Sequence, residues 1–185
     1  MRLLVSILLI VIPFFYSCEN DISEINKISS PEDAQLEIGK KIELLYSADG
    51  KVKARLLAPE LKRHRTKIPY TEMPKGLKMY FYNDSMVSES KLTAKYGITY
   101  EKSNEMIVRD SVVVINLKGE KLETEELIWN EQTQKITSSK FVKIQTRDEI
   151  IYGDGMEANS DLTNYKIKKI RGTIRLKDNP LEEKN

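Results

Sequence analysis

The sequence contains few of the residues on which most enzyme chemistry depends. Its 185 residues include one histidine, His64, and one cysteine, Cys18. Without a second histidine there is no base to activate a serine or cysteine nucleophile. No glycine-rich phosphate loop and no cluster with metal-ligand spacing is present either. We therefore expect a protein that is not an enzyme and that uses no cofactor and no metal.

The low proline and glycine content and the small net charge narrow the class of protein further. There are 6 prolines and 8 glycines, and 40% of the residues are hydrophobic, which excludes a disordered or fibrous chain and is enough for one core. The 30 Lys and Arg residues are interleaved with 28 Asp and Glu residues, and the net charge is +2. Because this balance gives no extended basic surface for binding phosphates, we expect no nucleic-acid partner.

The N-terminus has the pattern of an export signal. Arg2 precedes an apolar run from Leu3 to Phe15, which is too short to span a bilayer comfortably. A small residue before the lone Cys18 resembles a bacterial lipobox, although the aromatic residues preceding it depart from the usual motif. We predict that Cys18 is acylated and that its acyl chains hold the protein at a membrane. The alternative is a plain secretory peptide or a signal anchor with an incidental cysteine.

Composition divides the chain into four parts. Residues 1–17 are the predicted lipoprotein signal peptide, and residues 18–39 are a polar stretch that we interpret as the lipid anchor and a flexible tether. Residues 40–176 carry alternating apolar positions and form the predicted folded domain. Residues 177–185 are a charged tail.

A pattern repeated three times organises the domain. Between Leu92 and Ile174, each copy of about 30 residues has two alternating apolar segments around a polar turn. The alternation and the many β-branched residues predict paired strands, so each unit is about two strands and a turn. Asp49-Gly50 predicts a hairpin ahead of the repeats, and Leu77–Tyr82 predicts a core strand. The predicted fold is therefore all-β, a rolled antiparallel sheet.

The segment from Pro59 to Lys75 breaks this pattern and is predicted to be irregular. It contains the basic run Lys62–Lys67. For this run we favour a solvated strand face over a contact with an anionic lipid head group. His64, within the run, has no companion ligand and is not expected to bind metal.

The ordered set of segments in the domain resembles the LptC family of lipopolysaccharide export proteins. The likeness is carried by Leu92–Tyr96, by Asn116–Trp129 and by the turn at Gly153-x-Gly155, with Lys75–Tyr82 preceding them. It covers roughly residues 40–174, nearly the whole mature domain. The N-terminus departs from the well-known relatives, which have a transmembrane helix where this chain has a short run ending at Cys18.

Membership of this family would imply a twisted, partly open antiparallel β-roll (a β-jellyroll, or β-taco), as in the OstA-like domains of LptA. Its apolar interior would bind the acyl chains of lipopolysaccharide while the sugars stay in solvent. The protein would take the lipid from an inner-membrane ABC transporter of LptB, LptF and LptG type and relay it to an LptA-like roll through exposed strand edges. The implied location is the periplasmic side of the cell envelope, with inner-membrane anchoring by lipidation.

The phase of the alternation predicts which side chains point into the roll and are candidates for lipid contact. They are Leu92, Ala94, Ile98, Tyr100, Ile107, Val112, Val114, Leu122, Leu127, Trp129, Ile136, Val142, Ile144, Met156, Tyr165 and Ile167. The phase cannot separate a sealed core from a lined groove, because both need the same alternation.

Other functions are compatible with the same pattern. A structural or adaptor lipoprotein would use the sheet as a dry core and expose its edges to a protein partner. A soluble LptA-like bridge would differ in lacking an acyl group on Cys18. An envelope hydrolase would need clustered polar groups inside the roll.

Overall fold

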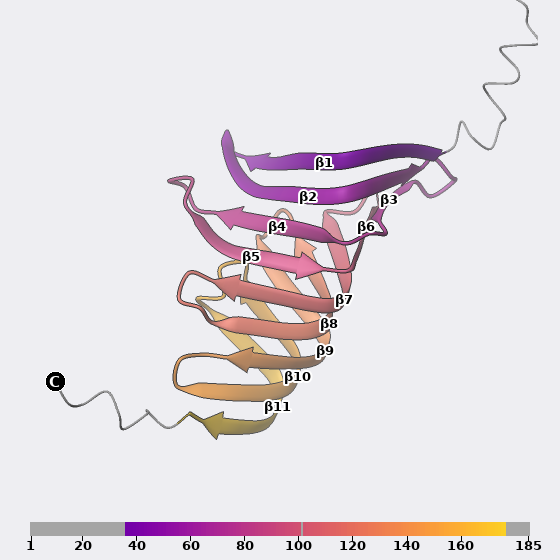
Figure 1. The fold of residues 1–185 in the computed structure, drawn as a ribbon. Coiled ribbons are helices and arrows are strands. Elements are labelled where there is room, and N and C mark those ends of the chain that lie inside the picture. The colour runs from indigo at the N-terminus through magenta and orange to yellow at the C-terminus, as the bar shows by residue number, and fades with distance from the viewer. Residues whose placement is uncertain (1–35, 101, 177–185) are drawn as a thin grey trace, which may run out of the picture. The chain divides into compact units, whose positions relative to one another are not determined.

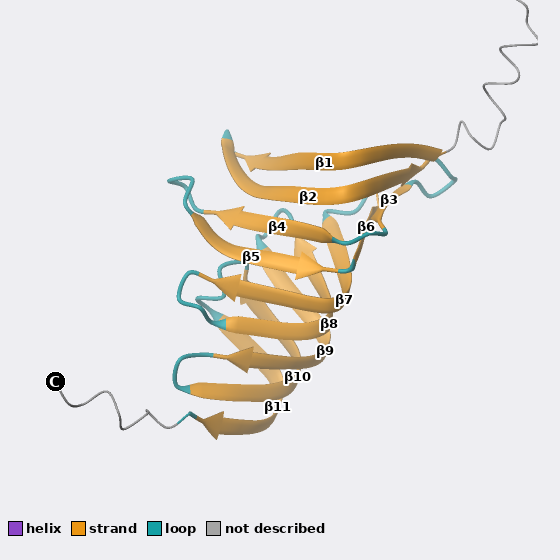
Figure 2. Ribbon diagram, viewed as in Figure 1, coloured by secondary structure: helices purple, strands orange, loops and turns teal. Residues whose placement is uncertain are grey.

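The computed structural model describes residues 36–100 and 102–176, which form an antiparallel sheet of eleven strands (Figures 1 and 2). The described residues contain no helix, and so none that is long and apolar enough to cross a membrane. The all-β prediction is confirmed. The strands are β1 (Leu36–Ala48), β2 (Lys51–His64), β3 (Tyr70–Met73), β4 (Leu77–Tyr82), β5 (Ser88–Ala94), β6 (Tyr96–Tyr100), β7 (Glu105–Asn116), β8 (Lys121–Asn130), β9 (Lys135–Gln145), β10 (Glu149–Asn159) and β11 (Tyr165–Arg175).

The sheet is folded over so that its long strands contribute to two walls. Residues 106–109 of β7 pair with β6, whereas residues 113–116 pair with β5. In the same way, β2 pairs with β4 through residues 54–57 and with β3 through residues 62–64. We call the layer that contains β4 and β5 the β5 wall, and the layer that contains β3 and β6 the β6 wall. Strands β8 to β11 pass from one wall to the other (Figure 1).

β-Bulges make the bend between the walls. In β7, Asp110 and Ser111 have φ angles of 64° and 55°, and the register with β8 shifts between Arg109 and Val112. The pairing of β8 with β9 and that of β9 with β10 shift at the corresponding places. Since a bulge adds a residue to one strand and bends it, a line of bulges across neighbouring strands folds the whole sheet.

One apolar core lies between the walls. It includes Phe81 and Val114 from the β5 wall and Met106 and Trp129 from the β6 wall, all less than 10% exposed. Burial of side chains from both layers against each other is the main force that holds the folded sheet together.

The sequence-based prediction was right about some elements and wrong about others. Asp49-Gly50 joins β1 to β2, and β4 spans Leu77–Tyr82, as expected. The prediction of an irregular segment from Pro59 to Lys75 is wrong, because β2 continues to His64 and β3 follows at Tyr70. Pro59 is tolerated because residues 58–61 of β2 pair with neither β3 nor β4. The start of the domain is also earlier than predicted, since β1 begins at Leu36.

Two glycines at the β11 end of the sheet make a matched test of packing. A Cβ on Gly153 would lie 2.3 Å from Cγ2 of Ile167 and 2.6 Å from the backbone oxygen of Lys169, whereas a Cβ on Gly172 would meet no described atom within 4 Å. We expect Gly153→Ala to lower the free energy of unfolding by about 1–3 kcal/mol through overpacking. Gly172→Ala should be neutral or slightly stabilising. Urea unfolding of both variants checks this, and equal losses would contradict it.

Candidate functional site

The interior between the walls contains most of the side chains predicted to point inward. Eleven of them belong to the buried core, and two more, Tyr165 and Ile167, are partly buried against it. The eleven are Leu92, Ala94, Val112, Val114, Leu122, Leu127, Trp129, Ile136, Val142, Ile144 and Met156. Most are fully enclosed, with Leu92, Val114 and Leu127 at 0% exposure. In this conformation they form a packed core and not an open groove.

Three predicted inward residues lie on the other face of the β6 wall. Ile98 pairs with Ile107, which lies between the core residues Met106 and Val108, so both isoleucines face away from the core cluster, although Ile98 is itself buried, at 8% exposure. Tyr100 shares the phase of Ile98 and is 40% exposed. The inward assignment of these three residues is therefore wrong.

The error came from a glycine that occupies a core position. In β6 the residue that faces the interior is Gly97, whose Cβ would lie 2.5 Å from Leu77 and 3.1 Å from Met73. Side chains from neighbouring strands fill the space that a residue at 97 would otherwise occupy. Because the repeat was aligned on large residues, Tyr100 was matched to Trp129, and the phase of β6 was reversed.

Sequence reasoning also missed some core residues. Met79 and Phe81 in β4 are buried, and their alternation within the predicted core strand was the available signal. Leu162 is 2% exposed although it lies in the turn between β10 and β11, with a φ of 59°. Nothing local marks a turn leucine as core, so this position depended on the tertiary structure.

An aromatic cluster lies near the side of the roll opposite the bend. The ring of Trp129 meets Tyr46 at 5.3 Å and Phe81 at 5.6 Å between centroids, both in edge-to-face geometry. The Trp129 side chain is 2% exposed, and among the described residues its Nε1 has no hydrogen-bond partner. A buried donor without an acceptor costs free energy, and it marks a place where an additional polar atom would be favourable.

Contacts of strand residues with turns of the opposite layer close the side of the roll opposite the bend, and we call this line of contacts the seam. The Ser90 hydroxyl of the β5 wall donates to the backbone carbonyl of Ser160 in the β10–β11 turn. The Tyr46 hydroxyl donates to the carbonyl of Glu131 at 3.0 Å. Leu162 inserts into the core beside these contacts. The seam therefore consists of a few polar contacts and one leucine, whereas continuous strands cross the bend.

A cleft of about 520 Å³ opens at the seam between the two walls. Phe81, Asn83 and Glu89 line it from the β5 wall, and Gln134 and Ser160 line it from the other side. Its rim is polar, and at its floor Phe81 contacts Trp129. The cleft thus reaches a ring of the interior aromatic cluster.

The Glu131 carboxyl at the seam predicts a pH dependence. Burial raises its pKa, so the native state binds a proton more tightly than the unfolded state does. This group's contribution to stability is present at low pH and is lost as pH rises through the raised pKa. We expect Glu131→Gln to be more stable than wild type at pH 7.5 and equal to it near pH 4, as measured by urea unfolding. The exposed Glu125→Gln is the control, and a Glu131→Gln gain that persists at the lower pH would contradict the prediction.

Within the basic run, His64 is engaged in contacts on the outer face of the β6 wall. Nε2 of His64 lies 3.0 Å from Oε1 of Glu72, and the Tyr96 hydroxyl donates to Oε2 of the same carboxylate at 3.1 Å. Burial and this hydrogen bond raise the pKa of Tyr96 to about 12. No group of His, Cys, Asp and Glu within the described residues could hold a metal ion.

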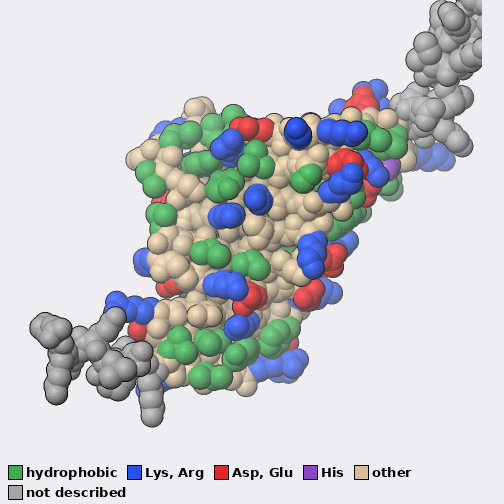
Figure 3. Space-filling model, in the orientation of Figure 1, with side chains coloured by type: hydrophobic (Ala, Val, Ile, Leu, Met, Phe, Trp, Pro, Cys, Tyr) green, Lys and Arg blue, Asp and Glu red, His purple; other side chains and the backbone are tan. Residues whose placement is uncertain are grey.

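Both outermost strands have one unpaired edge. Within residues 36–176, β1 pairs with β2 alone and β11 pairs with β10 alone. Exposed apolar side chains gather at both ends of the visible face (Figure 3). Leu45 on β1 and Ile174 on β11 are exposed apolar residues of the two edge strands. Unpaired edges of this length are templates for the addition of another strand.

The fold and the interior define a β-jellyroll, or β-taco, protein, a bent antiparallel sheet around one apolar core. The family model described as "Lipopolysaccharide-assembly, LptC-related" matches residues 3–175, so this chain belongs to the LptC family. The family consists of transport components and not of enzymes, and it acts in lipopolysaccharide transport on the periplasmic side of the cell envelope. No curated protein matches the chain.

Proposed function

We propose that this domain holds the acyl chains of lipopolysaccharide between its two walls and relays the lipid without covalent chemistry. It would receive the lipid from an inner-membrane ABC transporter of LptB, LptF and LptG type and pass it to an LptA-like roll. The observation that carries the proposal is the apolar interior, which extends from Leu56 in β2 to Ala158 in β10 and contains few polar side chains, among them Thr124 and Ser138. Such an interior matches hydrocarbon chains and offers little to sugars.

Acyl chains can enter a packed interior if the walls separate at the seam. Separation breaks the hydrogen bonds of Ser90 and Tyr46 and withdraws Leu162. Each hydrogen bond contributes about 0.5–1.5 kcal/mol net, and the exposure of one leucine costs about 1.5–3 kcal/mol. The loss of contacts between core side chains of the two walls, such as Phe81 on Trp129, adds to this cost. Burial of lipid chains in place of the seam contacts offsets this cost, while the continuous strands at the bend keep the two walls connected.

The unpartnered Nε1 of Trp129 supports the same site. A lipid chain attached through an ester or amide carries oxygen atoms near its polar end. An oxygen that accepts from Nε1 would satisfy a donor for which the described residues provide no acceptor. The indole is close to the seam cleft, through which the polar end of a bound lipid would reach solvent.

The unpaired edges supply the proposed partner contacts. β11 carries Lys166, Lys168, Lys169, Arg171 and Arg175 and no acidic residue. Strand addition at this edge would therefore favour a partner whose edge strand is acidic. The basic edge also disfavours the pairing of two copies through β11, because like charges would face each other.

Anchoring completes the proposal. Cys18, the predicted signal peptide, most of the tether and the charged tail lie outside the described residues. We propose acylation of Cys18 as the attachment to the inner membrane, on the sequence evidence given above. Labelling of cells with a radioactive fatty acid, in wild type and Cys18→Ser, tests this point separately from lipid transport.

The single tryptophan of the chain gives a direct test of lipid binding. We expect lipopolysaccharide to change the emission of Trp129 saturably, because the indole lies in the proposed lipid path. Lipopolysaccharide stripped of its acyl chains should leave the emission unchanged. An unchanged spectrum with both ligands would instead favour a structural adaptor, the alternative that the closed interior also fits.

A further inference from the structure

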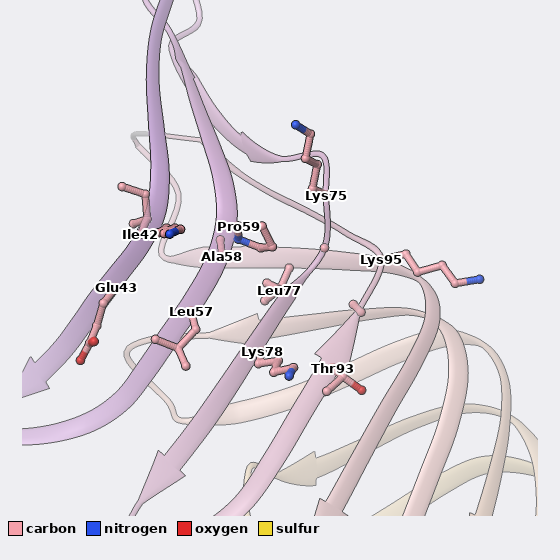
Figure 4. Close-up of a pocket in the computed structure, with 13 residues that line it drawn as sticks. Ile42, Glu43, Leu57, Ala58, Pro59, Lys75, Leu77, Lys78, Thr93 and Lys95 are labelled. Carbon is pink, nitrogen blue, oxygen red and sulfur yellow. The ribbon is translucent and has the colours of Figure 1, made fainter.

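One cavity on the described part of the chain lies at the bend. β2 leaves β4 after Leu57 and joins β3 at Lys62, so residues 58–61 have no neighbour on that side. The turn between β3 and β4 and the link between β5 and β6 border the same gap. A cavity of about 760 Å³ results, which we call the bend pocket. Figure 4 shows Leu57 and Leu77 on two sides of the hollow and Lys78 beside Thr93.

The bend pocket opens on the outer face of the sheet. Thr93 lies between the core residues Leu92 and Ala94 and pairs with Lys78, so both side chains point away from the interior. Leu57 has the same outward phase between Leu56 and Ala58. The pocket therefore opens away from the interior, and core side chains such as Leu77 and Ala94 form its floor.

The walls of the bend pocket are apolar, and its rim is positive. Four lysines line it, at positions 41, 75, 78 and 95, with Glu43 as its acidic member. Glu43 is bound by Arg55, whose Nε donates at 2.8 Å, and Lys75 is bound to Glu60 at 2.6 Å. Lys41, Lys78 and Lys95 form no ion pair with any described residue, so their charge is available to a ligand.

The backbone at the rim is also unusual. Lys41 lies in the middle of β1 with a φ of 52°, in the left-handed region that side-chain-bearing residues seldom adopt. It is the residue between Lys40 and Ile42, which pair with Glu60 and Ala58 across the same gap in β2. A strained residue that borders a ligand-sized pocket is a common feature of binding sites.

We propose that the bend pocket binds a phospholipid, with an acyl chain against Ile42, Leu57 and Leu77 and the phosphate near Lys41, Lys78 and the Thr93 hydroxyl. Mostly apolar walls with a few convergent polar groups are typical of small-molecule sites, whose volumes are roughly 300–1,000 Å³. Lysine ammonium groups suit a phosphate head group. The volume suits a lipid with few acyl chains. Lipopolysaccharide has many acyl chains, and its proposed site is the interior. The site would add a lipid contact beyond the proposed transport path.

Native mass spectrometry of the full chain in a neutral glycoside detergent tests this site. We expect a one-to-one adduct with phosphatidylglycerol and a much weaker adduct with diacylglycerol of the same chains. The double variant Lys41→Gln/Lys78→Gln should lose about tenfold of the adduct, because two charged donors to the phosphate are removed. The control Lys91→Gln/Lys118→Gln removes two exposed lysines outside the pocket and should keep the adduct.

Thr93→Trp fills the bend pocket from its outer side and should abolish the adduct while lipopolysaccharide capture persists. Three results would each overturn the phospholipid site. They are an equal adduct with diacylglycerol, an unchanged adduct in Lys41→Gln/Lys78→Gln, and full retention of the adduct in Thr93→Trp. An adduct reproduced by inorganic phosphate alone would also overturn it, because the pocket would then be an anion patch. Loss of lipopolysaccharide capture with an intact adduct would count against the transport function and not against this site.

Discussion

A short reducible reagent that joins Ser90→Cys to Ser160→Cys is expected to reduce lipopolysaccharide capture at least tenfold, and reduction should restore capture. These residues lie on opposite sides of the seam, where the Ser90 hydroxyl contacts the Ser160 carbonyl. Interior residues such as Leu127 and Val114 are 0% exposed, so acyl chains reach them only after the walls separate. The variant also carries Cys18→Ser, so that only the two introduced thiols react.

The matched control for the seam crosslink is a crosslink within one wall. Lys91 and Ile115 are directly paired between β5 and β7 and face outward. Joining Lys91→Cys to Ile115→Cys leaves the seam free and should leave capture unchanged. If the seam crosslink had no effect, entry by separation of the walls would be excluded.

Trp129→Ala is expected to lower the free energy of unfolding by about 3–5 kcal/mol, the range for a large aromatic residue removed from a core. The indole is 2% exposed and packs edge-to-face on Tyr46 and Phe81. Replacement by alanine therefore leaves a cavity between these two rings. Trp129→Phe should cost less, because it keeps a ring and removes a buried donor that no described residue satisfies. Urea unfolding measures both values.

Tyr100→Ala is the control for the tryptophan variants. The repeat pattern matched Tyr100 to Trp129, yet its ring lies on the outer face of the β6 wall and is 40% exposed. Its ring lies 6.2 Å from that of Tyr70, between centroids. We expect a loss of about 1 kcal/mol or less, in keeping with a surface position. Similar losses for Tyr100→Ala and Trp129→Ala would contradict the assignment of the two faces.

The strands could be predicted because alternation and turn chemistry are local signals. Asp49-Gly50 and the Leu77–Tyr82 pattern define their elements without help from the rest of the chain. The phase of β6 could not be predicted, because the residue facing the core is Gly97 and its neighbours fill the space. β3 was missed because Pro59 and the basic residues resemble a loop until the change of partner along β2 is known.

The interior was predictable in part, and its boundaries were not. Leu122, Leu127 and Trp129 follow from alternation once a bulge within β8 is allowed. The seam depends on Leu162 and Ser160, which belong to a turn and meet the β5 wall about seventy residues away in sequence. The bend pocket exists because β2 changes partner, which is a property of the sheet and not of any segment.

The most direct test of lipid transport through the interior is photo-crosslinking in cells. A benzophenone amino acid would replace Trp129 or Phe81, whose rings lie in the interior, and Tyr100, Lys118 or Glu125 as outward controls. The account predicts lipopolysaccharide adducts at Trp129 and Phe81 and none at the outward positions. Adducts at none of these positions, with the protein folded and exported, would contradict the proposal that the interior carries lipid.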